Sequence, residues 1–191
     1  MATTTNIVTN VGSGWFTIDN REGVDLNNPN PTVYSSSAGT TPETPGPYQR
    51  LGSRVQGNNN SEWVMVQAST TVSQNSLCAI DVNFAANPLT TTIASSLVYT
   101  YGICQIGTQQ ATNCQPGDYF WALLRASGGA TINISATAAK GVQLYIATAL
   151  PGAVTSTSTG TAVKNLYVNT APTAATITVD CVIPSYITVS T

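Results

Sequence analysis

The chain has 191 residues, of which 42% are hydrophobic and only 7% are charged, with a formal net charge of −2. This length suits a single domain with an ordinary core, but the charged share is far below the roughly 25% that is usual in soluble domains. The six lysines and arginines form no cluster. Because phosphate binding requires clustered basic residues, nucleic acid is excluded as a partner, and a surface so poor in charge favours association with other subunits.

Residues 1–60 are predicted to form an extended, mostly irregular N-terminal arm. They contain five of the ten prolines, in "NNPNPTVY" and "TPETPGPY", and a proline removes one donor from any ladder of backbone hydrogen bonds. "GWFTID" is the one credible short strand in this segment. We expect the arm to become ordered by lying on another surface, and a disordered leader is the alternative.

The N-terminus also bears on localisation. "MATTTNIVTNVGSGW" lacks the basic and apolar regions of a secretory signal. No apolar run approaches the roughly 20 residues that a membrane helix needs. We therefore expect synthesis in a cytoplasm and no membrane partner.

Residues 61–191 are predicted to form an all-β domain, a small β-barrel or β-sandwich of about eight short strands. Short segments rich in Val, Ile, Thr and Tyr alternate there with turn signals such as "QPGD", "SGG" and "LPG". "FAANPLTTTIASSL" has room for one short helical turn. "GSRVQGNNNSEW" is interpreted as a flexible hinge between the arm and the domain.

The stretch "NCQPGDYFWALLRASGGATINISA", residues 113–136, carries three consecutive aromatic residues. We interpret it as a core strand that is entered through a turn at "PGD" and is paired with "ATINISA" in a hairpin through Ser127-Gly128-Gly129. Trp63 and Trp121 are flanked by alternating apolar residues, which favours core packing over a platform for sugar rings. Tyrosines, with their polar tips, are better suited to an interface.

Catalytic chemistry finds little support in the sequence. Without any histidine, triads of the Ser-His-Asp and Cys-His kinds are excluded, together with the commonest general base. A carboxylate pair would have to come from Glu62, Asp81 and Asp118, but Asp118 lies in a turn motif in which aspartate usually bonds nearby backbone. We expect no enzymatic activity, no catalytic residues and no cofactor.

The four cysteines follow no metal-binding pattern. Their spacing contains no CxxC motif, and the usual mixed Cys/His sites are excluded, so we expect no metal. Buried free thiols are the favoured interpretation for a protein made in a cytoplasm, and a structural disulfide pair is the alternative. The cysteines are Cys78, Cys104, Cys114 and Cys181.

The order of several segments resembles that of tailed-phage capsid decoration, or cement, proteins. "SEWVMVQASTTVSQNSLCAID", "GICQIG" and "PGDYFWALLRASGGATINISATAAKGVQLYIATALPGAVTSTST" carry this resemblance, which covers about residues 55–165. It implies a structural virion protein on the capsid exterior that is assembled in the host cytoplasm. Such a protein binds the major capsid protein and stabilises contacts between capsomers, as a homo-oligomer for which a trimer is favoured and a dimer is the alternative.

The candidate interface residues are aromatic residues of the arm and sparse arginines, because an isolated charge in a neutral neighbourhood tends to be paired within the domain or across a subunit contact. An adhesin or fibre-head module that binds host-surface glycans through exposed aromatic residues is the alternative function. The candidate interface residues are Trp15, Phe16, Tyr34, Tyr48, Arg50, Arg54 and Arg125.

Overall fold

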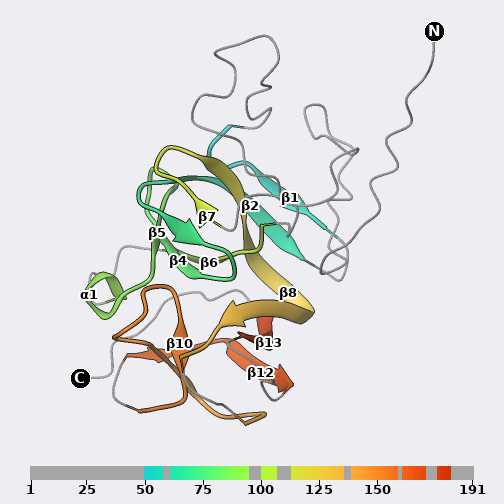
Figure 1. Ribbon diagram of the computed structural model, residues 1–191. Helices are drawn as coiled ribbons and strands as arrows, with labels where there is room; N and C mark the ends of the chain where they lie inside the picture. The colour runs from blue at the N-terminus through green and yellow to red at the C-terminus, as the bar shows by residue number, and fades with distance from the viewer. Residues whose placement is uncertain are drawn as a thin grey trace, which may run out of the picture.

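The computed structural model describes residues 50–57, 61–94, 100–106, 113–135, 139–158, 161–170 and 176–181. Strands dominate these residues, and the one described helix is the four-residue α1 (Thr91–Ala94), which lies within the segment predicted to hold a short helical turn. None of the described helices is long and apolar enough to cross a membrane. The prediction of an all-β fold is confirmed (Figure 1).

A closed barrel forms the first half of the fold. Its strands pair in the cyclic order β2, β5, β4, β6, β8 and back to β2, with β1 added at the outer edge of β2. The β2–β5 pairing is parallel and the others are antiparallel. The strands are β1 (Arg54–Gln56), β2 (Glu62–Ala68), β4 (Leu77–Ile80), β5 (Ala85–Pro88), β6 (Thr100–Cys104) and β8 (Tyr119–Asn133).

The two faces of the barrel strands bury two different cores. One core draws residues from all five strands of the ring, and it is therefore the barrel interior; it includes Phe120, Ala122 and Leu124 of β8. The residues that alternate with these, such as Trp121 and Leu123, belong to the other core, outside the barrel. Because both faces of the barrel part of β8 are buried, its sequence is a continuous apolar run and does not alternate between apolar and polar residues.

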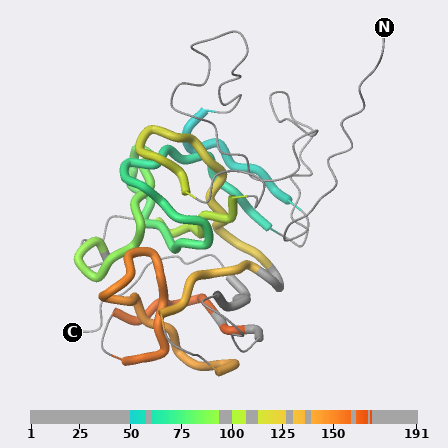
Figure 2. Tube along the Cα trace, viewed as in Figure 1, coloured from blue at the N-terminus to red at the C-terminus, as the bar shows by residue number. Residues whose placement is uncertain are grey.

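The second half of the fold covers the outside of the barrel. The far part of β8 pairs with β13 (Thr176–Cys181), which pairs with β12 (Leu166–Thr170). A three-stranded sheet joins β9 (Leu144–Ile146) to β10 (Val154–Thr155) and β11 (Ala162–Val163), and its apolar residues complete the outer core. Two short strands, β3 (Val72–Ser73) and β7 (Asn113–Cys114), pair with each other. Figure 2 follows the chain along β8 from the barrel into this second layer.

The predicted hairpin at residues 119–136 is wrong, because β8 runs uninterrupted from Tyr119 to Asn133. Its partner β13 matches Val179 with Ala130 but Cys181 with Ala126, so three residues of β8 lie opposite one residue of β13. Ser127-Gly128-Gly129 therefore forms a bulge and not a turn. Bulges bend a strand and increase its twist, and this one lies where β8 passes from the barrel to the second layer.

Residues 54–56 were assigned to the arm and its hinge, and the structure corrects this. They form β1, which pairs with Glu62–Val64 of β2, and Val55 is buried in the outer core. The backbone N–H of Gly52 already donates to the carbonyl of Met65, at 2.9 Å. The predicted boundary at residue 60 thus falls inside a hairpin, and residues 50–57 pack with the β-domain.

A buried glutamine ties the barrel to the second layer. Gln105 is only 6% exposed, and its side-chain amide donates to Asn75 Oδ1 at 2.9 Å and to the carbonyl of Thr131 at 2.6 Å. Its Oε1 accepts from the backbone N–H of Thr131, at 3.2 Å. A buried amide with its donors and acceptor satisfied specifies one geometry, so Gln105 fixes how the end of β6 meets the far part of β8.

Gly141 and Gly152 have nearly equal φ angles but different space around them, so their alanine variants should differ in stability. Gly152 has φ 78° and Gly141 has φ 77°, but a Cβ at Gly152 would lie 2.7 Å from Ser76 Cβ, whereas one at Gly141 meets nothing within 4 Å. We expect Gly141→Ala to lower the free energy of unfolding by about 1 kcal/mol through backbone strain. Gly152→Ala should cost at least about 1 kcal/mol more, which urea titration of both variants measures; equal losses would contradict the close approach.

Candidate functional site

Two of the predicted interface arginines meet around one carboxylate. Arg54 lies on β1, Glu62 opens β2 and Arg125 lies on β8 at the end of its barrel part. The strand pairing brings them together, because Glu62 lies opposite Gln56 on one side and opposite Arg125 on the other. We call Arg54, Glu62 and Arg125 the arginine cluster.

The arginine cluster has an excess of one positive charge. Arg54 Nη1 donates to Glu62 Oε1 at 2.9 Å, and Arg125 Nη2 lies 3.9 Å from Glu62 Oε2. The side chains of Arg54, Glu62 and Arg125 are 57%, 16% and 29% exposed. The carboxylate thus lies beneath two guanidinium groups that both reach solvent. The prediction that Arg125 is paired is confirmed, and its partner is Glu62 of the same domain.

Within the described residues, the guanidinium of Arg125 has a donor without a hydrogen-bond partner. At 3.9 Å its contact with Glu62 is an ion pair and not a short hydrogen bond. Among the described residues, its buried Nε–H also finds no acceptor. A buried donor without a partner costs about 1–3 kcal/mol, and arginine binds carboxylates through paired N–H groups. The buried Nε–H is not accessible from solvent, so the 29% of the Arg125 side chain that is exposed is the part that an incoming carboxylate could contact.

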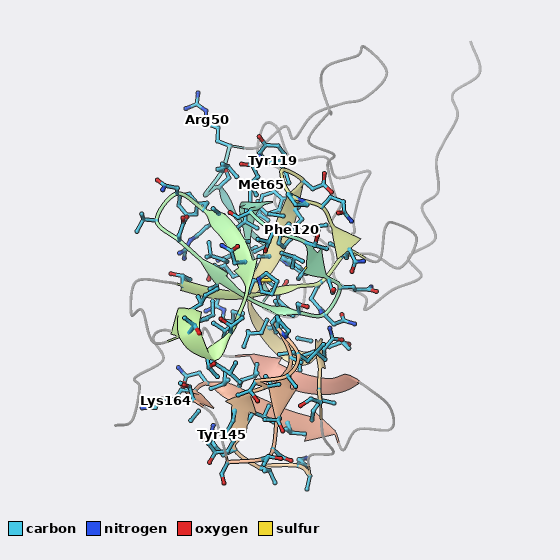
Figure 3. All side chains as sticks on the ribbon, turned by 60° about the vertical axis from the view of Figure 1, so that its left-hand side comes forward. Arg50, Met65, Tyr119, Phe120, Tyr145 and Lys164 are labelled. Carbon is cyan, nitrogen blue, oxygen red and sulfur yellow. The ribbon has the colours of Figure 1, made fainter. Side chains whose placement is uncertain are left out.

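Of the other predicted interface residues, the structure describes Arg50, and no described contact links it to this cluster. Arg50 is exposed, and Figure 3 shows it projecting away from the barrel. Trp15, Phe16, Tyr34 and Tyr48 lie outside the described residues.

The remaining acidic candidates for catalysis have local backbone partners. Asp81 Oδ1 accepts from the N–H groups of Asn83 and Ala85, both at 2.8 Å, and so holds the β4–β5 turn. Asp118 Oδ2 accepts from the N–H of Gln115 at 2.7 Å, which confirms the turn predicted at "PGD". Together with the position of Glu62 between two arginines, these contacts give each candidate carboxylate a structural role.

The tryptophans predicted to be core residues are confirmed as such. Trp63 and Trp121 are buried in the outer core, and Trp63 Nε1 donates to Ser61 Oγ at 3.0 Å. Tyr101 is also buried, contrary to the interface role expected of the tyrosines, and burial raises the pKa of its hydroxyl above 10.0. Tyr119 and Tyr145 are partly exposed and remain available for contacts.

Three of the four cysteines lie buried in the barrel interior as free thiols: Cys78, Cys104 and Cys114. Burial, reinforced by the nearby Cys114, raises the pKa of Cys78 well above its ordinary value of 9.0. The hydrogen bond with Cys114 and then burial raise the pKa of Cys104. No group of three or more potential ligand side chains within the described ranges is arranged to hold a metal ion.

Glu62 is the member of the cluster whose role the sequence did not reveal. The sequence identified Glu62 only as one of three candidate carboxylates. Its partners, Arg54 and Arg125, lie 8 residues before it and 63 residues after it in the chain. The pairing also depends on a register shift between Glu62 and Trp63. No local pattern encodes that irregularity.

The segments that carry the resemblance stated above form central parts of the fold. "EWVMVQA" is β2, "GICQIG" contains part of β6, and "GDYFWALLRA" leads from a turn into β8. Comparison with protein-family models finds none that matches the chain, and comparisons with curated proteins and with solved structures find no match either.

Proposed function

We propose that this chain is a structural virion protein that binds the outer surface of a phage capsid and stabilises contacts between capsomers. The observation that carries the proposal is the arginine cluster, which offers an excess positive charge on two partly exposed arginines of a chain that is otherwise poor in charge. The resemblance of the β2, β6 and β8 segments to capsid decoration proteins supports the choice of partner.

The position of the cluster supports a two-part attachment. Arg54 begins the first described strand and lies four residues after Arg50, where the described part of the chain begins. We propose that an N-terminal arm, as expected from the sequence, binds the capsid together with the arginine cluster. Two linked contacts bind more tightly than either alone, because the second forms at a high effective concentration.

The architecture supports a structural role through its rigidity. Both faces of the barrel strands are buried, and the two layers share one outer core. A rigid domain loses little conformational entropy when it binds. Trp63 and Trp121 are buried, so these two residues supply no platform for glycans and the adhesin alternative gains no support from them.

The proposal is tested by adding the full-length chain to expanded phage shells that lack it. We expect binding to saturate at a fixed ratio to the major capsid protein and to raise the temperature at which the shells break apart. Sedimentation followed by quantitative gel analysis measures the ratio. Absence of binding, or a few copies per particle, would contradict a role in cementing capsomers.

Arg125→Gln tests the cluster as the contact site. Arg54 still pairs with Glu62 in this variant, so the fold should persist, but capsid binding should weaken about tenfold through loss of a charged contact. Lys140→Gln is the matched control, since it removes one positive charge from an exposed turn. Equal binding of both variants, with unchanged circular dichroism spectra, would show that the cluster does not contact the shell.

A further inference from the structure

Two of the buried thiols in the barrel face each other. Cys104 ends β6 and Cys114 ends β7, and their Sγ atoms lie 4.0 Å apart in the interior. Cys78 lies in the same core, but its thiol is directed to the carbonyl of Ser76, at 3.4 Å. The pair Cys104 and Cys114 is therefore distinguished from Cys78 by its mutual contact.

We propose that Cys104 and Cys114 are a site of oxidative modification, at which a peroxide converts the two thiols into an intramolecular disulfide. A disulfide requires the sulfur atoms to approach to about 2.05 Å, so the pair must close by about 2 Å. Rotation of the two side chains and a shift of β7 would have to supply this movement. The inference rests on the thiol geometry alone and does not depend on the proposed function.

Local opening of the short strand β7 would expose the thiol of Cys114 to the oxidant. β7 has two residues and pairs only with the two-residue β3 among the described strands. Cys104, by contrast, lies in β6, which is paired with both β4 and β8. Elements with few hydrogen bonds open locally at low free-energy cost. The thiol of Cys114 is thus the first to be exposed.

The reaction balances with hydrogen peroxide as the two-electron oxidant. The sulfur of Cys114 attacks one peroxide oxygen, the O–O bond breaks, and a sulfenic acid and one water molecule form. The sulfur of Cys104 then attacks the sulfenic sulfur, the S–S bond forms, and the S–O bond breaks. The hydroxide that leaves takes the proton of Cys104, so that two thiols are oxidised and one peroxide is reduced to two water molecules.

The native environment keeps the reaction slow until the barrel opens. The thiolate is the reactive form of cysteine, and the raised pKa of Cys104 keeps its thiol protonated at neutral pH. Once formed, the disulfide would tie the end of β6 to β7 and close the chain between residues 104 and 114. Closing a loop of this size stabilises the folded state, so oxidation would lock this end of the barrel.

The test measures thiols in the full-length native protein before and after treatment with hydrogen peroxide. After quenching, the protein is unfolded and alkylated, and mass spectrometry counts the labelled cysteines. We expect the count to fall from four to two, with Cys104 and Cys114 joined in one cross-linked peptide. The melting temperature should rise by about 5 °C, and dithiothreitol should reverse the rise.

Three variants make the outcome specific to this pair. Cys78→Ala should still lose two thiols, whereas Cys104→Ala and Cys114→Ala should lose none to an intramolecular bond. Mapping of the wild-type cross-link decides the question even if a variant fails to fold. A disulfide that involves Cys78 or Cys181, a bond between two chains on a non-reducing gel, or four thiols remaining after treatment would overturn the proposal.

Discussion

Replacing Phe120 with alanine is expected to lower the free energy of unfolding by about 3–5 kcal/mol, the range for loss of a buried aromatic side chain. Phe120 is fully buried in the barrel interior, opposite Val66 of β2, and Figure 3 shows it among the packed strands of the barrel. The surrounding strands form a closed barrel, which resists collapse into the cavity that the missing phenyl group leaves. Urea titration followed by tryptophan fluorescence measures the loss.

Val82→Ala provides the matched control for this prediction. Val82 lies in the β4–β5 turn and is 73% exposed, so removal of its methyl groups should change the free energy of unfolding by less than about 0.5 kcal/mol. A loss for Phe120→Ala no larger than that of the control would show that the barrel interior is not packed as described.

Raising the pH above 9 is expected to destabilise the protein steeply. Burial holds the pKa of Cys78 far above 9.0 in the folded state. Below pH 9 the thiol is protonated in both states, and its stabilising contribution is complete. Above pH 9 the unfolded chain releases the proton while the folded chain retains it, so the free energy of unfolding falls by about 1.4 kcal/mol per pH unit for this thiol.

The titrations of Cys104 and Tyr101 also lower the free energy of unfolding as the pH rises. The pKa of Cys104 is raised above 9.0 and that of Tyr101 above 10.0, so their contributions are lost as the pH rises beyond these values. Urea titrations between pH 8 and pH 11 measure the slope. In Cys78→Ala the slope above pH 9 should become shallower by about 1.4 kcal/mol per pH unit, and an unchanged slope would show that this thiol does not titrate as inferred.

Local chemistry was enough to predict several features of the fold. The strand formers and turn signals predicted an all-β domain, and the Pro-Gly-Asp turn before β8 is confirmed, with Asp118 bonding the backbone of Gln115. The burial of Trp63 and Trp121 was also predicted correctly. These features depend on residues close together in the chain, for which propensity and alternation are informative.

The bulge in β8 was missed because a Gly-Gly pair has more than one meaning. Ser127-Gly128-Gly129 satisfies the backbone requirements of a hairpin turn as well as those of a bulge. The choice depends on the partner strand, and β13 lies about 50 residues further along the chain. The prediction that residues 54–56 belong to the arm and its hinge was wrong for a similar reason: their strand conformation depends on pairing with β2 and not on their own sequence.

The sequence by itself determined the strand-rich character of the protein, its low charge and its lack of histidine chemistry, because these follow from composition and short-range preference. Only the tertiary structure decided that the strands close into a barrel, that Glu62 joins Arg54 to Arg125, and that Cys104 faces Cys114. Each of these depends on strand order and register, which are set by packing among residues far apart in the chain.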